Sequence, residues 1–238
     1  MEKTIEELIE EALKDIANLV LNSEVSTRII MPHYRTDEEN AEAAKIRYSE
    51  QELKENFLRK VEKESEFYYS VETPSKKVYS ISNSEKPAVK VEKAKEDHFE
   101  SARFDVSLYK EAKPESLKSH IEFKHDNKDE KEVEKDFVKL SQEIVEGEKN
   151  YFVHYLVKGS KKWESVSFPS IMKKYSEASN NNYIDKEALK NVVIYLMIVN
   201  TGDEKSYTIW RINLEEFKEN INAGLSYTPY DFKKWVRA

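Results

Sequence analysis

The chain has 238 residues, of which 36% are charged and 39% are hydrophobic, and its mean hydropathy is −0.79. A chain of this length can bury a substantial core, either in one large domain or in one domain with a helical appendage. It contains no cysteine, which excludes disulfide frameworks and thiolate metal sites. Its formal net charge of −7 argues against a protein that coats nucleic acid nonspecifically.

The sequence shows no pattern typical of secretion or membrane insertion. The N-terminus is acidic and lacks the basic start and apolar centre of a signal peptide. The longest apolar run, residues 192–199, is far too short to span a bilayer. We therefore expect a cytoplasmic protein without a membrane partner.

Hydrophobic periodicity predicts both helices and strands. Apolar residues recur every three or four positions in the helical segments, and they alternate or cluster in the short strand segments. In the N-terminal half we expect a helix at 4–21, a helix at 38–64, strands at 66–72 and 76–82, and an exposed lysine-rich loop at 83–98. The helix at 38–64 includes Ile46 in its apolar stripe, and a capping box of Thr36 and Glu39 marks its start.

The same patterns continue through the second half of the chain. The expected elements are strands at 101–109 and 119–125, a helix at 128–146, a strand at 151–157, a helix at 168–178, strands at 191–200 and 206–212, a helix from its cap Asn213 to about 222, and a short final helix that begins at Thr228. The chain is therefore predicted to be of the mixed α/β class.

The tripeptide Glu-Phe-Lys occurs twice, and its meaning depends on the secondary structure around it. The copy at 216–218 follows a helix cap; residues two apart on a helix point in different directions, so Lys218 is expected to extend into solvent. The copy at 122–124 lies in a predicted strand. There Glu122 and Lys124 share one face of a sheet, while Phe123 points to the other.

A second carboxylate is expected beside Glu122. Asp105 lies in the preceding strand, with Phe104 and Val106 pointing away from it, and a hairpin-like return makes the two strands neighbours. Mg²⁺ prefers oxygen ligands and keeps several waters, so Asp105, Glu122 and the backbone carbonyl of Phe123 can form a site for Mg²⁺, with Mn²⁺ as a substitute. The two acids repel each other without a cation, so removing one is not expected to destabilise the fold.

At these residues the chain resembles the PD-(D/E)XK nuclease superfamily, whose core is a helix, three strands, a helix and a further strand. The predicted elements between 38 and 157 follow that order. The resemblance implies that Asp105 and Glu122 are metal ligands and that Lys124 is the base that handles the attacking water. It also implies that Glu50, on the first helix, is an accessory acid.

The resemblance further implies a restriction-endonuclease-like fold, in which helices flank a mixed sheet. The expected organisation is an N-terminal helical appendage at 1–35, a nuclease-like core at 36–160, and a C-terminal α/β extension at 161–238 packed on the same domain.

Two groups of lysines are candidates for contact with a polyanion. The C-terminal third has a net positive charge, and its expected contacts with nucleic acid are Lys158, Lys161, Lys162, Lys173 and Lys174. A second stripe lies on the helix at 128–146 and consists of Lys128, Lys131, Lys135 and Lys139. This stripe lies opposite the apolar face of that helix, so we expect it to face water.

These observations favour a Mg²⁺-dependent enzyme that hydrolyses DNA phosphodiester bonds, an endonuclease of restriction, defence or repair type. A homodimer suits duplex cleavage, because each subunit supplies one centre for one of two antiparallel strands. Two alternatives remain open. One is a non-enzymatic acidic α/β interaction protein in which Asp105, Glu122 and Lys124 form a salt bridge on the strand surface. The other is a ribonuclease on the same fold.

Overall fold

The fold is known from a computed structural model of the whole chain. The structure describes residues 2–22, 24, 32–33, 45–46, 49–81, 89–92, 102–126, 128–159, 168–202, 204–222 and 236–237.

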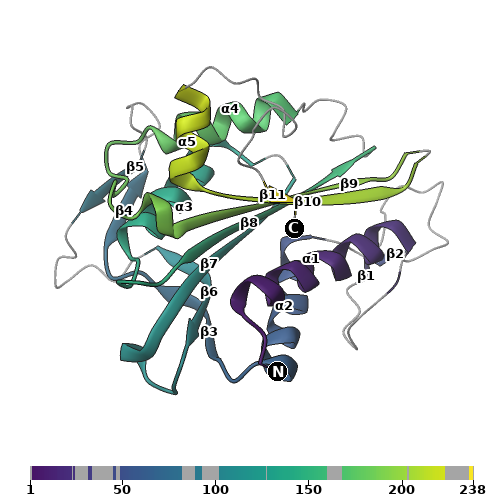
Figure 1. The fold of residues 1–238 in the computed structure, drawn as a ribbon, viewed down its shortest axis with the longest axis horizontal. Helices are drawn as coiled ribbons and strands as arrows, with labels where there is room; N and C mark the ends of the chain where they lie inside the picture. Colours follow the sequence, from purple (N-terminus) through teal and green to yellow (C-terminus); the bar gives the residue numbers. More distant parts are fainter. Residues whose placement is uncertain are drawn as a thin grey trace.

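The described residues form one large mixed sheet with strand order β11-β10-β9-β8-β7-β6-β3 (Figure 1). In sequence order its strands are β3 (Tyr68–Pro74), β6 (Arg103–Tyr109), β7 (Leu117–His125), β8 (Asn150–Lys158), β9 (Val192–Asn200), β10 (Ser206–Asn213) and β11 (Val236–Arg237). Neighbours are antiparallel from β3 to β7, parallel from β7 to β9, and antiparallel again from β9 to β11.

Helices cover both faces of this sheet (Figure 1). The helices are α1 (Ile5–Asn22), α2 (Glu50–Glu64), α3 (Glu130–Gln142), α4 (Phe168–Ser179) and α5 (Leu214–Asn222). Helices α1 and α2 share one apolar core with one face of the sheet, and α3, α4 and α5 share a second core with the opposite face. The two parallel connections, β7 to β8 and β8 to β9, pass through α3 and α4 on the same face.

Local sequence explains where the elements nearest the site begin and end. Helix α2 begins after Ser49, whose hydroxyl accepts a hydrogen bond from the backbone N–H of Gln51 at 3.3 Å, as expected of an N-cap serine. Strand β7 contains Ile121 and Phe123 on the face covered by α1 and α2. The chain leaves β7 at Asp126, whose φ of 61° lies in the left-handed region that aspartate tolerates better than most residues.

Most predicted elements are present with boundaries shifted by a few residues, and the α/β class is correct. The helix expected at 38–64 is wrong at its start, because it begins at Glu50 and Ile46 belongs to β2 (Lys45–Ile46), which pairs with β1 (Pro32–His33). The capping pair Thr36 and Glu39 lies outside the described residues.

Two further expectations differ from the structure. The strand expected at 76–82 is β4 (Val78–Ile81), and it pairs with β5 (Val89–Glu92) in a separate two-stranded sheet instead of joining the main one. The loop expected at 83–98 therefore contains a strand. The final helix expected from Thr228 falls mostly outside the described residues, and the described pair at 236–237 is strand β11.

None of the helices in the described ranges is long and apolar enough to cross a membrane.

Candidate active site

Strands β6 and β7 separate at Asp105. Backbone pairing between them runs from Tyr109 opposite Leu117 to Val106 opposite Ile121 and then stops. Beyond that point a side chain makes the connection: Oδ2 of Asp105 accepts a hydrogen bond from the backbone N–H of Phe123 at 2.8 Å. We call this opening between the strands the fork.

Where β6 separates from β7, its side chains at 104 and 106 pack in the two different cores of the molecule. Val106 packs in the core beneath α1 and α2, whereas Phe104 packs in the core beneath α3 and stacks on His120 with ring centroids 3.7 Å apart. The expectation that Phe104 and Val106 share a face is therefore wrong. Strict alternation fails there because β6 leaves its pairing with β7 at Asp105.

Glu122 and Lys124 share a face, as the alternation of β7 predicts. They lie beside Phe152 and His154 of the parallel strand β8. Phe152 belongs to the core beneath α3, and His154 contacts Tyr175 of α4. The acid and the lysine therefore point toward the layer of α3 and α4.

Beneath α3 these two residues join a buried ionic cluster of four side chains. Lys139 of α3 donates a hydrogen bond to Oε1 of Glu122 at 2.5 Å, and its Nζ is 3.1 Å from Oδ1 of Asp136. Lys124 Nζ is 3.0 Å from the other oxygen of Asp136, Oδ2, and 3.8 Å from Oε2 of Glu122. Two acids and two lysines thus alternate around the cluster, and the formal charges balance.

The two lysines of the cluster have different surroundings. Lys139 is 2% exposed, and its third donor bonds the backbone carbonyl of Arg103 at 2.8 Å, so three acceptors match its three N–H groups. Its ammonium also lies 5.1 Å from the ring centre of Phe104. The side chain of Lys124 is 11% exposed, and among the acids of the described residues Asp136 lies nearest to its Nζ, at 3.0 Å. This contact is an ion pair, because Oδ2 of Asp136 has no hydrogen-bond partner in the described part of the chain. Lys139 is therefore enclosed, whereas Lys124 lies at the partly exposed edge of the cluster.

Burial and mutual charge determine the ionisation of the cluster. Burial raises the pKa of Glu122 well above its ordinary value, and the nearby charges of Asp136 and Asp105 add to this effect. Burial alone would lower the pKa of Lys124, but the surrounding carboxylates outweigh it and raise that pKa far above its ordinary value. In order of decreasing effect these carboxylates are Asp136, Glu122, Glu50 and Asp105. All three predicted acids thus act electrostatically on the predicted lysine.

Glu50 reaches this group from the first turn of α2. Its Oε2 is buried, lacks a hydrogen bond in the described structure, and lies 3.4 Å from Nζ of Lys128. Burial raises the pKa of Glu50, and the charge of Asp105 adds to the rise, while Lys124 and Lys128 oppose it. The residue predicted as an accessory acid is therefore close to the fork and costly to ionise.

The chain segment after β7 is held from two sides. His154 Nε2 lies 2.6 Å from the carbonyl oxygen of Asp126, so it donates the proton of that hydrogen bond, and Nδ1 accepts from the hydroxyl of Tyr175 at 2.5 Å. Lys174 of α4 donates to the carbonyl of Lys128 at 2.7 Å. These bonds fix the segment from which Lys128 extends to α2.

The lysines expected to contact nucleic acid do not form one described group. Lys158 is exposed at the end of β8, and Lys173 is exposed on α4 with Glu177 3.7 Å away. Lys174 is instead engaged with a backbone carbonyl. Lys161 and Lys162 lie outside the described residues.

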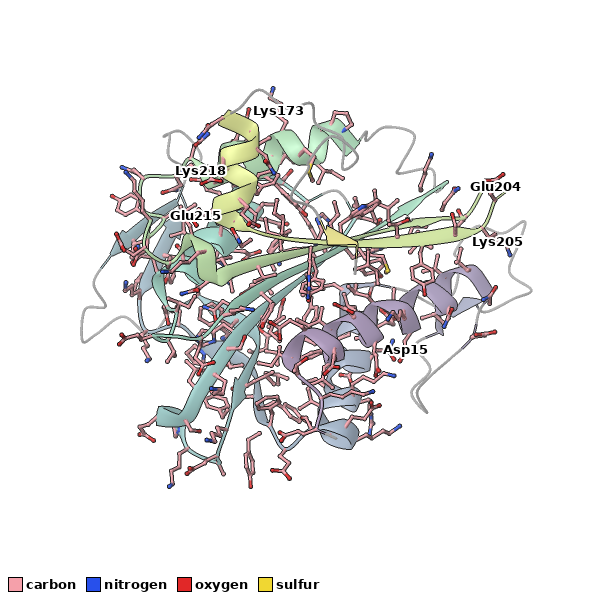
Figure 2. All side chains as sticks on the ribbon, viewed as in Figure 1. Asp15, Lys173, Glu204, Lys205, Glu215 and Lys218 are labelled. Carbon is pink, nitrogen blue, oxygen red and sulfur yellow. The ribbon has the colours of Figure 1, made fainter. Side chains whose placement is uncertain are left out.

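The second Glu-Phe-Lys copy is structural. The side chain of Asn213 accepts the backbone N–H of Glu216 at 2.8 Å, which confirms the predicted cap of α5. Lys218 and Lys173 lie on the same side of the sheet (Figure 2). The expectation that Lys218 extends into solvent is wrong, because its Nζ donates to the carbonyl of Ser179 at 2.8 Å at the end of α4.

Two residues of the cluster, Asp136 and Lys139, were missed by reasoning from sequence. Lys139 was expected to face water with the other lysines of its stripe, and this is wrong, because Glu122 lies on the sheet directly beneath it. Asp136 borders the apolar stripe of α3, so a helical wheel places it near the sheet. That border position was the available signal, but the wheel alone does not reveal a charged partner on the opposing strand.

The oxygen donors near the fork suit a hard divalent cation in chemical type. Within the described residues, the buried Oε2 of Glu50 has an ion pair with Lys128 at 3.4 Å but no hydrogen bond, and Asp105 uses one of its two oxygens to bind Phe123. Within the described ranges, however, no three His, Asp or Glu side chains are arranged to hold a metal, and Oε1 of Glu122 is bonded to Lys139. Of the three predicted acids, Glu122 is the one that is bonded to Lys139 in the described structure.

A surface hollow of about 640 Å³ lies elsewhere, at the opposite end of β3 and β6. It is lined by Glu66, Tyr68, Lys110, Glu111, Ala112 and Lys113, none of which belongs to the fork or the cluster.

Comparisons with protein-family models, with curated proteins and with solved structures find no match to this chain.

Proposed function

We propose that the protein is a metal-dependent nuclease that hydrolyses phosphodiester bonds of DNA at the fork. The observation that carries the proposal is the hydrogen bond from Phe123 to Asp105, which joins β6 to the part of β7 that carries Glu122 and Lys124, whose Oε2 and Nζ lie 3.8 Å apart. The charges of Asp105 and of Glu50 on α2 also act on Lys124. The order of helix, three strands, helix and strand, here α2, β3, β6, β7, α3 and β8, supports it. This order agrees with the resemblance to the PD-(D/E)XK superfamily.

In this proposal Lys124 acts as a charged donor. An ammonium ion-paired to Asp136 at 3.0 Å donates hydrogen bonds and does not accept a proton. Its role is then to orient the attacking water or to stabilise negative charge on the phosphoryl oxygens, and this replaces the role of base that the sequence resemblance implied. Hydrolysis joins the water oxygen to phosphorus and releases a sugar oxygen.

Asp105 and Glu50 would hold a divalent cation, together with the carbonyl of Phe123. In an extended strand the N–H and C=O of one residue point to the same neighbouring strand. Because the N–H of Phe123 points to Asp105, its carbonyl faces the same side. A bound Mg²⁺ would polarise the phosphoryl oxygen and lower the pKa of a coordinated water.

The test is cleavage of plasmid, linear, branched and single-stranded DNA, with RNA as a parallel substrate, in Mg²⁺, Mn²⁺ and EDTA. Lys124→Ala is expected to lower turnover by roughly 10²- to 10⁴-fold, with little change in DNA binding in Ca²⁺, because one cation supplies a small part of the affinity. Lys113→Ala is the control, since the Lys113 side chain is 69% exposed and remote from the fork. Equal activity of the two variants in a preparation that cuts DNA would place the active site elsewhere.

The exposed lysines allow a separate test of where DNA binds. Replacing Lys158, Lys161, Lys162 and Lys173 together by Ala is expected to weaken binding and reduce its salt dependence while single-turnover cleavage stays near normal. Lys174 is left unchanged, because its side chain supports the backbone of Lys128. Sedimentation of the protein with and without duplex DNA tests the proposed homodimer.

The ionic cluster also favours a second candidate function, a non-enzymatic interaction protein. The charges of Glu122, Lys124, Asp136 and Lys139 balance within the core, as they would in a purely structural cluster. In that case wild-type protein cleaves none of the substrates in any metal, and Lys124→Ala lowers only the stability of the protein.

A further inference from the structure

Asp136 pairs with both lysines of the ionic cluster at once. One carboxylate oxygen, Oδ2, is 3.0 Å from Nζ of Lys124, and the other, Oδ1, is 3.1 Å from Nζ of Lys139. Asp136 is 4% exposed. A single buried carboxylate on α3 thus connects the lysine of the fork with the enclosed lysine beneath the helix.

The ammonium of a lysine on a strand occupies one defined position only if a nearby acid holds it there. The four-carbon stem of the side chain has many rotamers, and fixing them costs side-chain entropy that a close partner must offset. Glu122 does not fix the ammonium of Lys124 closely, because its Oε2 is 3.8 Å away and its Oε1 is bonded to Lys139. Among the described acids, Asp136 therefore makes the closest ion pair with this ammonium, at 3.0 Å.

We propose that Asp136 is the positioning residue for Lys124 and that Lys139 holds Asp136 in place. Lys139 is itself unsuited to act on a substrate, because it is 2% exposed and its donors are matched by Glu122, Asp136 and the carbonyl of Arg103. The role in turnover rests on the proposed nuclease function, whereas the positioning of the ammonium does not.

The test compares Asp136→Asn with Glu134→Gln. Asparagine preserves shape but removes the charge, and its amide can present an oxygen to only one of the two lysines. Because Asp136 holds Lys124 through an ion pair, loss of the charge is expected to release Lys124. A displacement of about 1 Å can cost about 10²-fold in rate, so kcat is expected to fall by about that factor while KM and DNA binding in Ca²⁺ stay unchanged. Glu134 is a buried acid on the same helix that bonds Asn181 instead of the cluster, so its variant is expected to keep normal turnover.

A measurement without substrate tests the positioning alone. The side-chain ammonium of Lys124 is expected to give a ¹H–¹⁵N signal protected from exchange with water, assigned by its loss in Lys124→Ala. In Asp136→Asn this signal should disappear, while that of Lys139 persists through Glu122 and the Arg103 carbonyl. Should wild-type protein cleave nothing, the nuclease proposal fails and this signal still decides the positioning.

The proposal is overturned if the Lys124 signal persists in Asp136→Asn, or if Asp136→Asn and Glu134→Gln lower kcat equally. Should Asp136→Asn fail to fold, Asp136→Glu retains the charge for Lys139 and moves the carboxylate by one methylene. That variant is expected to lower kcat without changing KM, and wild-type kcat in a folded Asp136→Glu protein would equally overturn the proposal.

Discussion

The backbone N–H of Phe123 donates to Oδ2 of Asp105 at 2.8 Å, so a side chain of β6 takes the place of the next backbone pair between β6 and β7. This bond gives the backbone N–H of Phe123 an acceptor at the point where β6 no longer pairs with β7. It also fixes one carboxylate oxygen of Asp105 at the fork. The same residue thereby links the two strands at the fork, and its charge acts on Glu122 and Lys124.

Two substitutions of Asp105 are expected to separate these roles. Asp105→Asn keeps an oxygen that can accept from Phe123, so it should abolish cleavage with little loss of stability. Asp105→Ala removes the acceptor and should destabilise the protein by about 1–3 kcal/mol. Urea unfolding and cleavage assays on both variants provide the comparison. An equal stability loss in the two variants would show that the charge, and not the hydrogen bond, supports the fold.

Lys139→Met is expected to destabilise the protein by about 3–5 kcal/mol, because it leaves two buried acids with Lys124 as the one remaining lysine of the cluster. Lys113→Met, at an exposed position, should change the free energy of unfolding by less than about 0.5 kcal/mol. Urea unfolding of both proteins measures the difference. A loss below about 1 kcal/mol for Lys139→Met would mean that the cluster contributes little to stability.

Glu122→Gln is expected to destabilise the metal-free protein, contrary to the expectation from sequence that either acid could be removed without such a loss. Glu122 is 2% exposed and is paired more closely than Glu50: its Oε1 accepts from Lys139 at 2.5 Å. Burial raises the pKa of Glu122, as it does for Glu50, but removing the charge of Glu122 leaves the buried Lys139 partly uncompensated, and this loss is expected to exceed the relief from removing a costly charge. The midpoint of thermal unfolding in EDTA should fall below that of wild type. A raised midpoint would instead indicate that repulsion from Asp136 and Asp105 dominates at this site.

Glu50→Gln is expected to change how stability depends on pH. Burial and Asp105 raise the pKa of Glu50 in the folded state above its ordinary value of 4.5. The folded state therefore favours the protonated acid, so stability present below the ordinary pKa is lost as pH rises through the raised pKa. Without divalent cations the variant should melt higher than wild type at pH 7 and equally at pH 4. Identical melting curves at both pH values would contradict the burial of this charge.

His154 is expected to remain neutral, with its proton on Nε2, down to about pH 4. Burial lowers its pKa to about 3, and the Asp126 carbonyl next to Nε2 can only accept a hydrogen bond. Long-range ¹H–¹⁵N spectra distinguish the two tautomers and the imidazolium. Tyr175→Phe, which removes the donor to Nδ1, is the matched variant and should preserve the tautomer. A doubly protonated ring at pH 5 would contradict this arrangement.

Local patterns in the sequence determined most of the helices and strands and which side of each is buried. Alternation in β7 places Glu122 and Lys124 together, and the apolar periodicity of α1 and α3 predicts which side of each helix is buried. The cap at Asn213 likewise follows from its side chain and the next turn of backbone. These features depend on residues only a few positions apart, which is why the sequence alone reveals them.

Contacts between distant segments were decided only by the tertiary structure. Lys128 and Lys139 belong to one predicted stripe, yet Lys128 pairs with α2 and Lys139 is buried over Glu122. Nothing in the helical periodicity identifies the residue on the opposing strand, because that depends on where α3 crosses the sheet. The separation of β6 from β7 at Asp105 is similarly an outcome of strand pairing. The packing of α3 on the sheet thus makes Lys139 a buried counterion of Glu122, whereas Lys124 lies at the partly exposed edge of the same cluster.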